Sequence, residues 1–122
     1  MQIQVLNNCG NSPKMLLIIE LYRYYVDSNF AKILTFFADD IHWHISHEIN
    51  LHGLNDVERY LVSKEIQPAA ILTLKYVLTH GKLAAVNGEI SYKGKTVRFS
   101  DFYEFSSASS KAKIKKITST SH

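Results

Sequence analysis

The stretch that decides the fold is TVRFSDFYEF, residues 96–105, because it alternates almost strictly between apolar and polar side chains. Its apolar face holds Val97, Phe99, Tyr103 and Phe105. Since successive strand residues point to opposite faces, the pattern predicts a long, half-buried β-strand. Asp101 stands in the middle of the apolar row. A carboxylate there is either a satisfied structural group or a working acid/base, so any function depends on Asp101.

The neighbouring segments predict further strands joined by tight turns. Lys93-Gly94 is a hairpin turn that leads back to a strand over Leu83–Tyr92, and Gly81-Lys82 leads back to one over Ile71–Thr79. On that strand we expect one face to carry Leu72, Leu74, Tyr76 and Leu78. Residues 111–119 form the last strand, in which Ile114 and Ile117 break the alternation and predict a β-bulge. Strands linked in this way make an antiparallel sheet.

The first half of the chain predicts three helices and one more strand. Ser12-Pro13 is a cap followed by proline at the first helical position, and the helix runs to about Asp27. Asn29 caps a second helix that ends at Asp39-Asp40, with an apolar stripe of Phe30, Ile33, Leu34 and Phe37. A strand over residues 41–45 follows, then a loop or hairpin to residue 54. Asn55 and Glu58 resemble a capping box that opens the third helix, to about residue 65. This order predicts an α+β fold.

Length and composition set the bounds. The 122 residues are enough for one domain, which we place at 12–122, after an N-terminal arm over 1–11 that ends in a turn at Gly10-Asn11. Cys9 is the single cysteine, which excludes an intrachain disulfide and favours a cytoplasmic protein. No apolar run approaches the length of a membrane span. The net charge of +3 is mild, and the lysines of residues 111–116 read as a solvated strand face, so no nucleic-acid partner is expected.

The chain resembles the nuclear transport factor 2-like superfamily, and within it the SnoaL-like polyketide cyclases and ketosteroid isomerase relatives. The resemblance rests on NFAKILTFFADDIHW (29–43), LHGLNDV (51–57) and the hairpins from Ala85 onward. It implies a curved, mixed or antiparallel sheet wrapped as a cone around three N-terminal helices. It also implies a pocket between the concave sheet face and the helices, and a homodimer formed through the convex face.

The catalytic residues of the ketosteroid isomerases carry over unevenly. Those enzymes use a tyrosine on the first helix, an aspartate general base and a protonated aspartate in the penultimate strand. Counted along this chain, the tyrosine position falls on Leu21 and the general base on Ile45. Tyr22 and Tyr25 are near the first position but out of register. Only the third position matches, at Asp101, which disfavours steroid isomerase activity.

Two functions therefore stay open. In the first, the protein is an isomerase, cyclase or hydrolase that binds a small hydrophobic carbonyl compound, with Asp101 as its catalytic residue. We expect the aromatic residues of the pocket to bind that ligand: Tyr25, Trp43, Tyr76, Phe99 and Tyr103. In the second, it is a non-catalytic ligand carrier or dimerisation module of the same fold, whose aromatics largely fill the cone. Neither function implies a cofactor.

Two histidines alternate on the predicted strand over 41–45. His42 and His44 project to one side, a spacing that is compatible with two metal ligands, with His47 or His52 as a third. That side is the convex face, and no conventional metal motif accompanies it. We therefore predict no metal site and favour a pair of histidines at the seam of a dimer.

Overall fold

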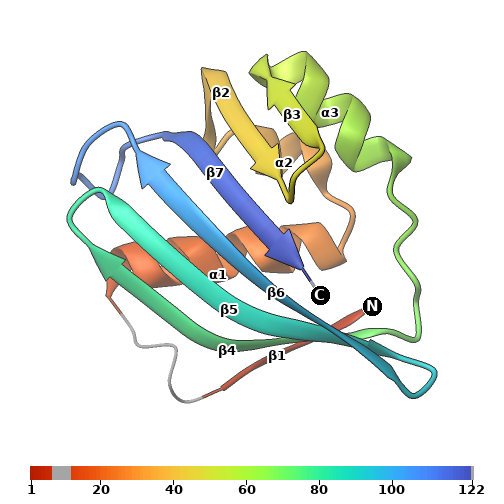
Figure 1. Ribbon diagram of the computed structural model, residues 1–122. Helices are drawn as coiled ribbons and strands as arrows, with labels where there is room; N and C mark the ends of the chain where they lie inside the picture. Colours follow the sequence, from red (N-terminus) through yellow and green to blue (C-terminus); the bar gives the residue numbers. More distant parts are fainter. Residues whose placement is uncertain (7–11, 122) are drawn as a thin grey trace.

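Seven strands form one curved sheet in the order β1-β4-β5-β6-β7-β2-β3, as the computed structural model shows (Figure 1). The structure describes residues 1–6 and 12–121. The strands are β1 (Gln2–Val5), β2 (Phe37–Ile45), β3 (Ile49–His52), β4 (Ile71–His80), β5 (Leu83–Tyr92), β6 (Lys95–Phe105) and β7 (Ile114–Ser121). The helices are α1 (Pro13–Val26), α2 (Phe30–Leu34) and α3 (Gly53–Ser63).

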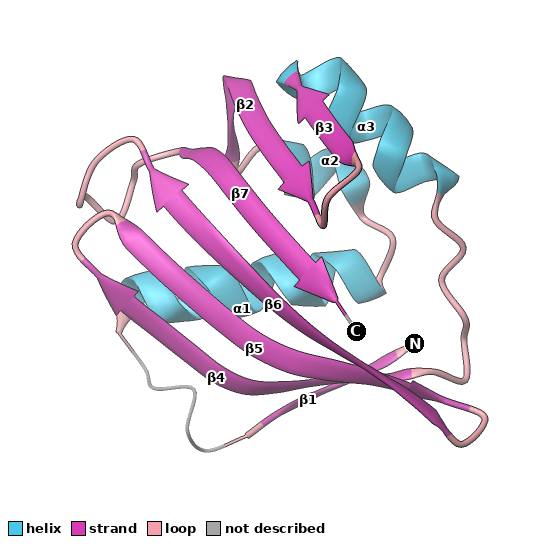
Figure 2. Ribbon diagram, viewed as in Figure 1, coloured by secondary structure: helices cyan, strands magenta, loops and turns pink. Residues whose placement is uncertain are grey.

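The helices lie against one face of the curved sheet, and this confirms the predicted α+β class and the cone (Figure 2). Strands β4 to β7 are antiparallel neighbours, whereas β7 pairs with β2, and β4 with β1, in parallel. The core between sheet and helices is fully buried at Ile18, Ile41, Val57, Leu74, Val77 and Ile114. None of the helices in residues 1–6 and 12–121 has the length and apolar character needed to cross a membrane.

The N-terminal arm contributes a strand. Gln2–Val5 pairs with residues 71–74 of β4 at the edge of the sheet. The short sequence QIQV does not by itself predict this pairing. The turn expected at Gly10-Asn11 and the thiol of Cys9 lie outside the described residues.

Two helix boundaries differ from the prediction. The Asn29 side chain caps α2 through the amide of Lys32, as expected, but the helix ends at Leu34. Phe37 already belongs to β2 and pairs with Ile114, so it is buried from a strand rather than from the helical stripe. The prediction that the helix reaches Asp39-Asp40 was therefore wrong. A stripe at i, i+3, i+4 and i+7 cannot distinguish one long helix from a short one followed by a buried strand residue.

The start of α3 also differs. The helix begins at Gly53, and the carboxylate of Asp56 accepts a hydrogen bond from the His52 amide at 3.0 Å. The acid that reaches back to the helix start is therefore Asp56, and the predicted box of Asn55 and Glu58 was wrong. The segment before it is a hairpin, because β3 pairs antiparallel with β2.

A bulge in β4 reverses the faces of its second half. The register with β5 shifts between Leu74 and Tyr76, so Val77 is buried while Tyr76 and Leu78 are exposed. The expectation that Tyr76 and Leu78 share one face with Leu72 and Leu74 was wrong. The register of β6 with β7 shifts between Glu104 and Phe105, opposite Lys116 and Ile114, which confirms the bulge predicted for the last strand.

Candidate functional site

A cavity of about 270 Å³ lies between the inner face of the sheet and the helices. Its walls are mainly apolar and aromatic side chains, and they come from α1, α2, α3 and five of the strands. Lys64, Val97 and Thr120 line it and are exposed, so they mark its mouth. The deeper wall includes Leu21, Tyr22, Phe37, Trp43, Leu61, Leu72, Phe99, Asp101, Tyr103 and Ser119.

Most of the residues singled out in the sequence meet in this cavity. Asp101, Tyr103 and Phe99 reach it from β6, Trp43 from β2 and Tyr25 from α1. Tyr76 does not line it. Its side chain is 47% exposed on the outer face, because the bulge in β4 turns it away.

Asp101 belongs to a hydrogen-bond network that is joined by the Tyr22 hydroxyl. The hydroxyl of Tyr22 donates to the Asp101 carboxylate, and it is 2.6 Å from the hydroxyl of Tyr103. Tyr22 and Tyr103 are 7% and 5% exposed, so both phenols are shielded from bulk water. The one carboxylate in the apolar row of β6 therefore contacts the buried phenol of Tyr22 and, through it, is linked to Tyr103.

Burial governs the protonation of this network. Desolvation raises the pKa of Asp101, and hydrogen bonds from Ser119 and Tyr22 to the carboxylate oppose that rise. The pKa values of Tyr22 and Tyr103 are raised well above the ordinary value, first by desolvation and then by the charge of Asp101. Both phenols therefore keep their protons at neutral pH, while the carboxyl group is able to exchange its proton closer to neutrality than an exposed aspartate.

A second chain of contacts fixes Trp43. Its indole nitrogen donates to the Ser119 hydroxyl at 2.9 Å, and Ser119 faces Asp101 across the β6–β7 pair. The Trp43 ring also meets Tyr60 of α3 edge-on, with the centroids 5.4 Å apart. The largest aromatic of the wall is thus held from both sides.

The sequence did not predict the roles of Tyr22 and Ser119. The positions that match the ketosteroid isomerase tyrosine and general base, Leu21 and Ile45, both line the cavity but are apolar. Tyr22 reaches the carboxylate from the next position along α1. Tyr22 is buried on α1, and the pairing of β6 with β7 sets Ser119 opposite Asp101; both arrangements depend on tertiary contacts rather than on a local pattern.

The histidines of β2 lie away from this cavity. His42 stacks on His52 with ring centroids 4.3 Å apart, and His44 contacts the Asn50 side chain at 2.7 Å. Among residues 1–6 and 12–121, no group of three or more histidine, cysteine or acidic side chains could hold a metal ion.

No protein-family model matches the sequence, and no curated protein matches it. Solved structures do match. An NTF2-like protein of unknown function from Cytophaga hutchinsonii is 24% identical with a TM-score of 0.67, over 85% of this chain and 95% of that one. A ketosteroid isomerase-like protein from Kribbella flavida is 14% identical with a TM-score of 0.75, over 90% and 78%.

A third similar structure is that of SalBIII, an epoxide hydrolase/cyclase-like enzyme with a role in forming the pyran ring of the polyether salinomycin. SalBIII is 12% identical with a TM-score of 0.71, over 89% of this chain and 90% of that one. The chain therefore has the NTF2-like fold, shared with ketosteroid isomerase-like and polyketide cyclase-like proteins, as its sequence indicated. That fold is a scaffold for many functions, so the function has to be argued from the site.

Proposed function

We propose that the cavity binds a small hydrophobic molecule that carries a carbonyl group, and that Asp101 is the acid/base of an isomerase, cyclase or hydrolase-type reaction on it. The observation that carries the proposal is the Asp101 carboxyl, which is half-buried in the wall of an apolar cavity and bonded to Tyr22. A carboxyl group whose pKa is raised by burial can give a proton to a bound carbonyl oxygen or take one from the adjacent carbon.

The two tyrosines support this chemistry. The Tyr22 hydroxyl is hydrogen-bonded to both Asp101 and Tyr103. When the charge of the carboxyl group changes, both hydroxyl groups are therefore polarised in response. Such preformed dipoles stabilise charge that develops in a transition state without reorganisation. The similarity to a cyclase-like enzyme is in keeping with this proposal.

One observation favours a carrier instead. Leu21 and Ile45 occupy the positions where related isomerases have a tyrosine and a second aspartate, so Asp101 is the one carboxylate among the cavity-lining residues that the structure describes. Its hydrogen bonds to Tyr22 and Ser119 also satisfy it without a ligand. In a carrier, such a pocket would bind its ligand without reacting.

An exchange experiment separates the two. Acetophenone and 2-acetylnaphthalene are small methyl ketones whose methyl protons exchange with D₂O when the carbonyl is activated. We expect the wild type to accelerate this exchange, measured by NMR. Asp101→Asn should lose at least about a hundredfold of the acceleration, the low end of the usual contribution of acid/base catalysis. Asp39→Asn, at an exposed position, is the control.

Each outcome is decisive. If a ketone changes the fluorescence of Trp43, the one tryptophan in the chain, but its exchange is not accelerated, the protein is a carrier. If Asp101→Asn exchanges as fast as the wild type, Asp101 is not the acid/base. If neither ketone binds, the proposed ligand class is wrong.

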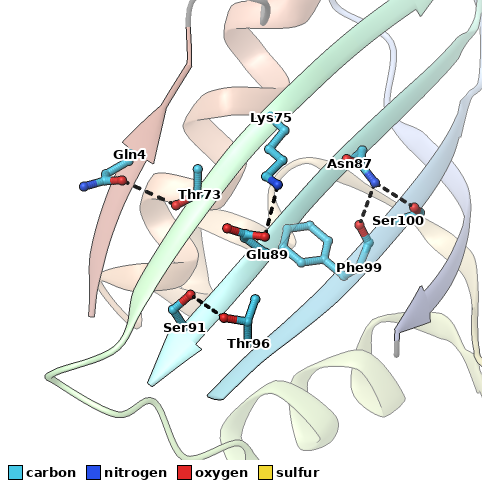
Figure 3. A network of polar contacts seen from close by, with 9 residues as sticks. All are labelled: Gln4, Thr73, Lys75, Asn87, Glu89, Ser91, Thr96, Phe99 and Ser100. Atoms are coloured by element: carbon cyan, nitrogen blue, oxygen red, sulfur yellow. Dashed lines mark hydrogen bonds and ion pairs between the residues drawn. The ribbon is translucent and has the colours of Figure 1, made fainter. Parts of the chain in front are cut away.

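We also propose that two copies associate through the outer face of the sheet. That face has a polar half, in which Thr73, Lys75, Asn87, Glu89 and Ser91 find partners within the chain (Figure 3). Its other half carries exposed apolar side chains: Tyr76, Leu78, Leu83 and Phe102.

The apolar half is built for a self-complementary contact. Ala85 pairs with Leu78 on one side and Phe102 on the other, so a small residue lies between two large ones that are 57% and 54% exposed. Tyr76, two positions before Leu78, and Leu83, two positions before Ala85, are also exposed and enlarge this apolar area. In a two-fold pairing, Leu78 or Phe102 of one copy can fill the space above Ala85 of the other.

Sedimentation equilibrium tests the association. We expect a dimer for the wild type and a monomer for Phe102→Asp. Val62→Asp places the same charge at an exposed apolar residue of α3, away from the sheet, and should remain dimeric. A monomeric wild type, or a dimeric Phe102→Asp, would contradict the proposal.

A further inference from the structure

Among the cavity-lining residues that the structure describes, Lys64 is the one lysine, and it stands at the mouth, directly after the end of α3. Within residues 1–6 and 12–121 four ion pairs form, and Lys64 takes part in none of them. Asp101 is the only carboxylate among the described lining residues, and Tyr22 and Ser119 already hydrogen-bond to it. The entrance therefore carries a positive charge with no neutralising group in the described wall.

The position of this charge is defined by aromatic side chains. The Lys64 ammonium lies 4.8 Å from the centroid of the Tyr60 ring, a cation–π contact. Tyr60 in turn meets Trp43 edge-on, deeper in the wall. A cation therefore stands at one end of an aromatic wall.

Tyr25 lines the same cavity as the cation and the carboxyl group of Asp101. Burial raises the pKa of its hydroxyl, the charge of Lys64 lowers it, and the charge of Asp101 raises it. Both charges therefore act on the same phenol. A ligand in this cavity is therefore exposed both to the cation of Lys64 and to the carboxyl group of Asp101.

We propose that Lys64 forms an anion subsite and that the ligand is a small amphipathic carboxylic acid, with its carboxylate at Lys64 and its apolar body directed inward toward Asp101. This inference rests on the proposed hydrophobic ligand of the cavity and adds its charged end. The volume of about 270 Å³ falls just under the roughly 300–1,000 Å³ of pockets for drug-sized ligands. It suits an acid with one or two rings, or a short chain, rather than a larger molecule.

Calorimetric titration with two matched probes tests the charge preference. 2-Naphthoate and 2-naphthamide share their ring system and nearly their shape, and differ in charge. We expect the wild type to bind the carboxylate about three- to tenfold more tightly than the amide. This factor corresponds to an ion pair with Lys64 that is stronger than a fully exposed pair and weaker than a desolvated one. Added salt should weaken binding of the carboxylate alone.

Two lysine variants locate the preference. Lys64→Met keeps the apolar stem but removes the charge, and it should make the affinities for the two probes equal. Lys93→Met is the matched control, because Lys93 also lies over a tyrosine ring, 5.3 Å from the centroid of Tyr92, but does not line the cavity. It should keep the wild-type preference.

The outcomes distinguish this inference from the proposed function. If the wild type binds the amide as tightly as the carboxylate, or if Lys64→Met weakens both equally, the anion subsite is refuted while the hydrophobic pocket stands. If neither probe binds, both proposals fail for ligands of this class.

Discussion

The Tyr22 hydroxyl donates a hydrogen bond to the carboxylate of Asp101, which joins α1 to β6 across 79 positions of the chain. The same hydroxyl is 2.6 Å from that of Tyr103, so one phenol connects the two polar groups of the inner strand face. The contact turns an isolated carboxylate in an apolar row into part of a network, and it gives the first two predictions.

The pH dependence of stability should reveal the buried carboxyl group. Burial raises the pKa of Asp101 above 3.8, so the folded protein binds its proton more tightly than the unfolded chain does. Stability contributed by the protonated form is complete below about pH 3.8 and is lost as the pH rises through the folded pKa. Asp101→Asn should lack this loss, so its free energy of unfolding should rise relative to the wild type between acid and neutral pH.

Urea titrations at several pH values measure the free energy of unfolding, and Asp39→Asn is the control. Parallel profiles for Asp101→Asn and the wild type would contradict the raised pKa.

Removal of the connecting hydroxyl should cost stability. Tyr22→Phe leaves a buried carboxylate short of a donor, and we expect a loss of about 1–3 kcal/mol. Tyr103→Phe removes a hydroxyl with one recorded partner, Tyr22, and should cost less. A double-mutant cycle of Tyr22→Phe with Asp101→Asn should give a coupling of about 0.5–3 kcal/mol. Additive effects in urea unfolding would show that the hydrogen bond contributes nothing.

Lys14 should matter for stability although it is charged. Its ammonium, on α1, contacts the carbonyl oxygens of Gly81, Ser107 and Ala108 at 3.1–3.4 Å and lies 4.4 Å from the centre of the Phe105 ring. It thereby ties the helix to two loops of the sheet. Lys14→Met should lower the free energy of unfolding by about 1–3 kcal/mol, because the carbonyls lose a charged donor.

The control for this change is Lys95→Met, at an exposed position at the start of β6. Hydrogen exchange should become faster in residues 106–112 of the Lys14 variant and stay unchanged in the control. Equal stability of the two variants would show that the buried contacts of Lys14 are dispensable.

Gly88 should tolerate no side chain. A Cβ atom there would lie 2.4 Å from the Thr73 carbonyl oxygen and 2.7 Å from the Phe99 ring. The carbonyl is backbone and cannot rotate away, and Phe99 lines the cavity. Gly88→Ala should destabilise the protein by about 1–3 kcal/mol or more.

The control is Gly94→Asn. Nothing lies within 4 Å of a Cβ atom at that position, and asparagine tolerates its positive φ of 77°. Thermal unfolding compares the two variants. A Gly88→Ala protein as stable as Gly94→Asn would mean that β4 and β5 can separate at this point without cost.

The sequence by itself determined most of the fold, because the signals that decide it are local. Ser12-Pro13 fixed the start of α1, and Lys93-Gly94 fixed the hairpin that defines β5 and β6. In Lys95–Phe105 the alternation placed Asp101, Tyr103 and Phe99 on one face, and all three line the cavity. A period of two and a turn are properties of a few neighbouring residues, so no tertiary information was needed.

Tertiary structure decided the features that depend on pairing between distant segments. The outward position of Tyr76 follows from a register shift against β5, next to the pairing of Leu74 with Gly88, where β4 approaches too closely for a side chain. The partner of Asp101 depends on which side of α1 faces the sheet: one helical position separates the apolar Leu21 from Tyr22, the residue that reaches the carboxylate. The sequence could therefore place a carboxylate on the inner face, but only the packing of a helix against a strand 79 positions away could supply its hydrogen-bond donor.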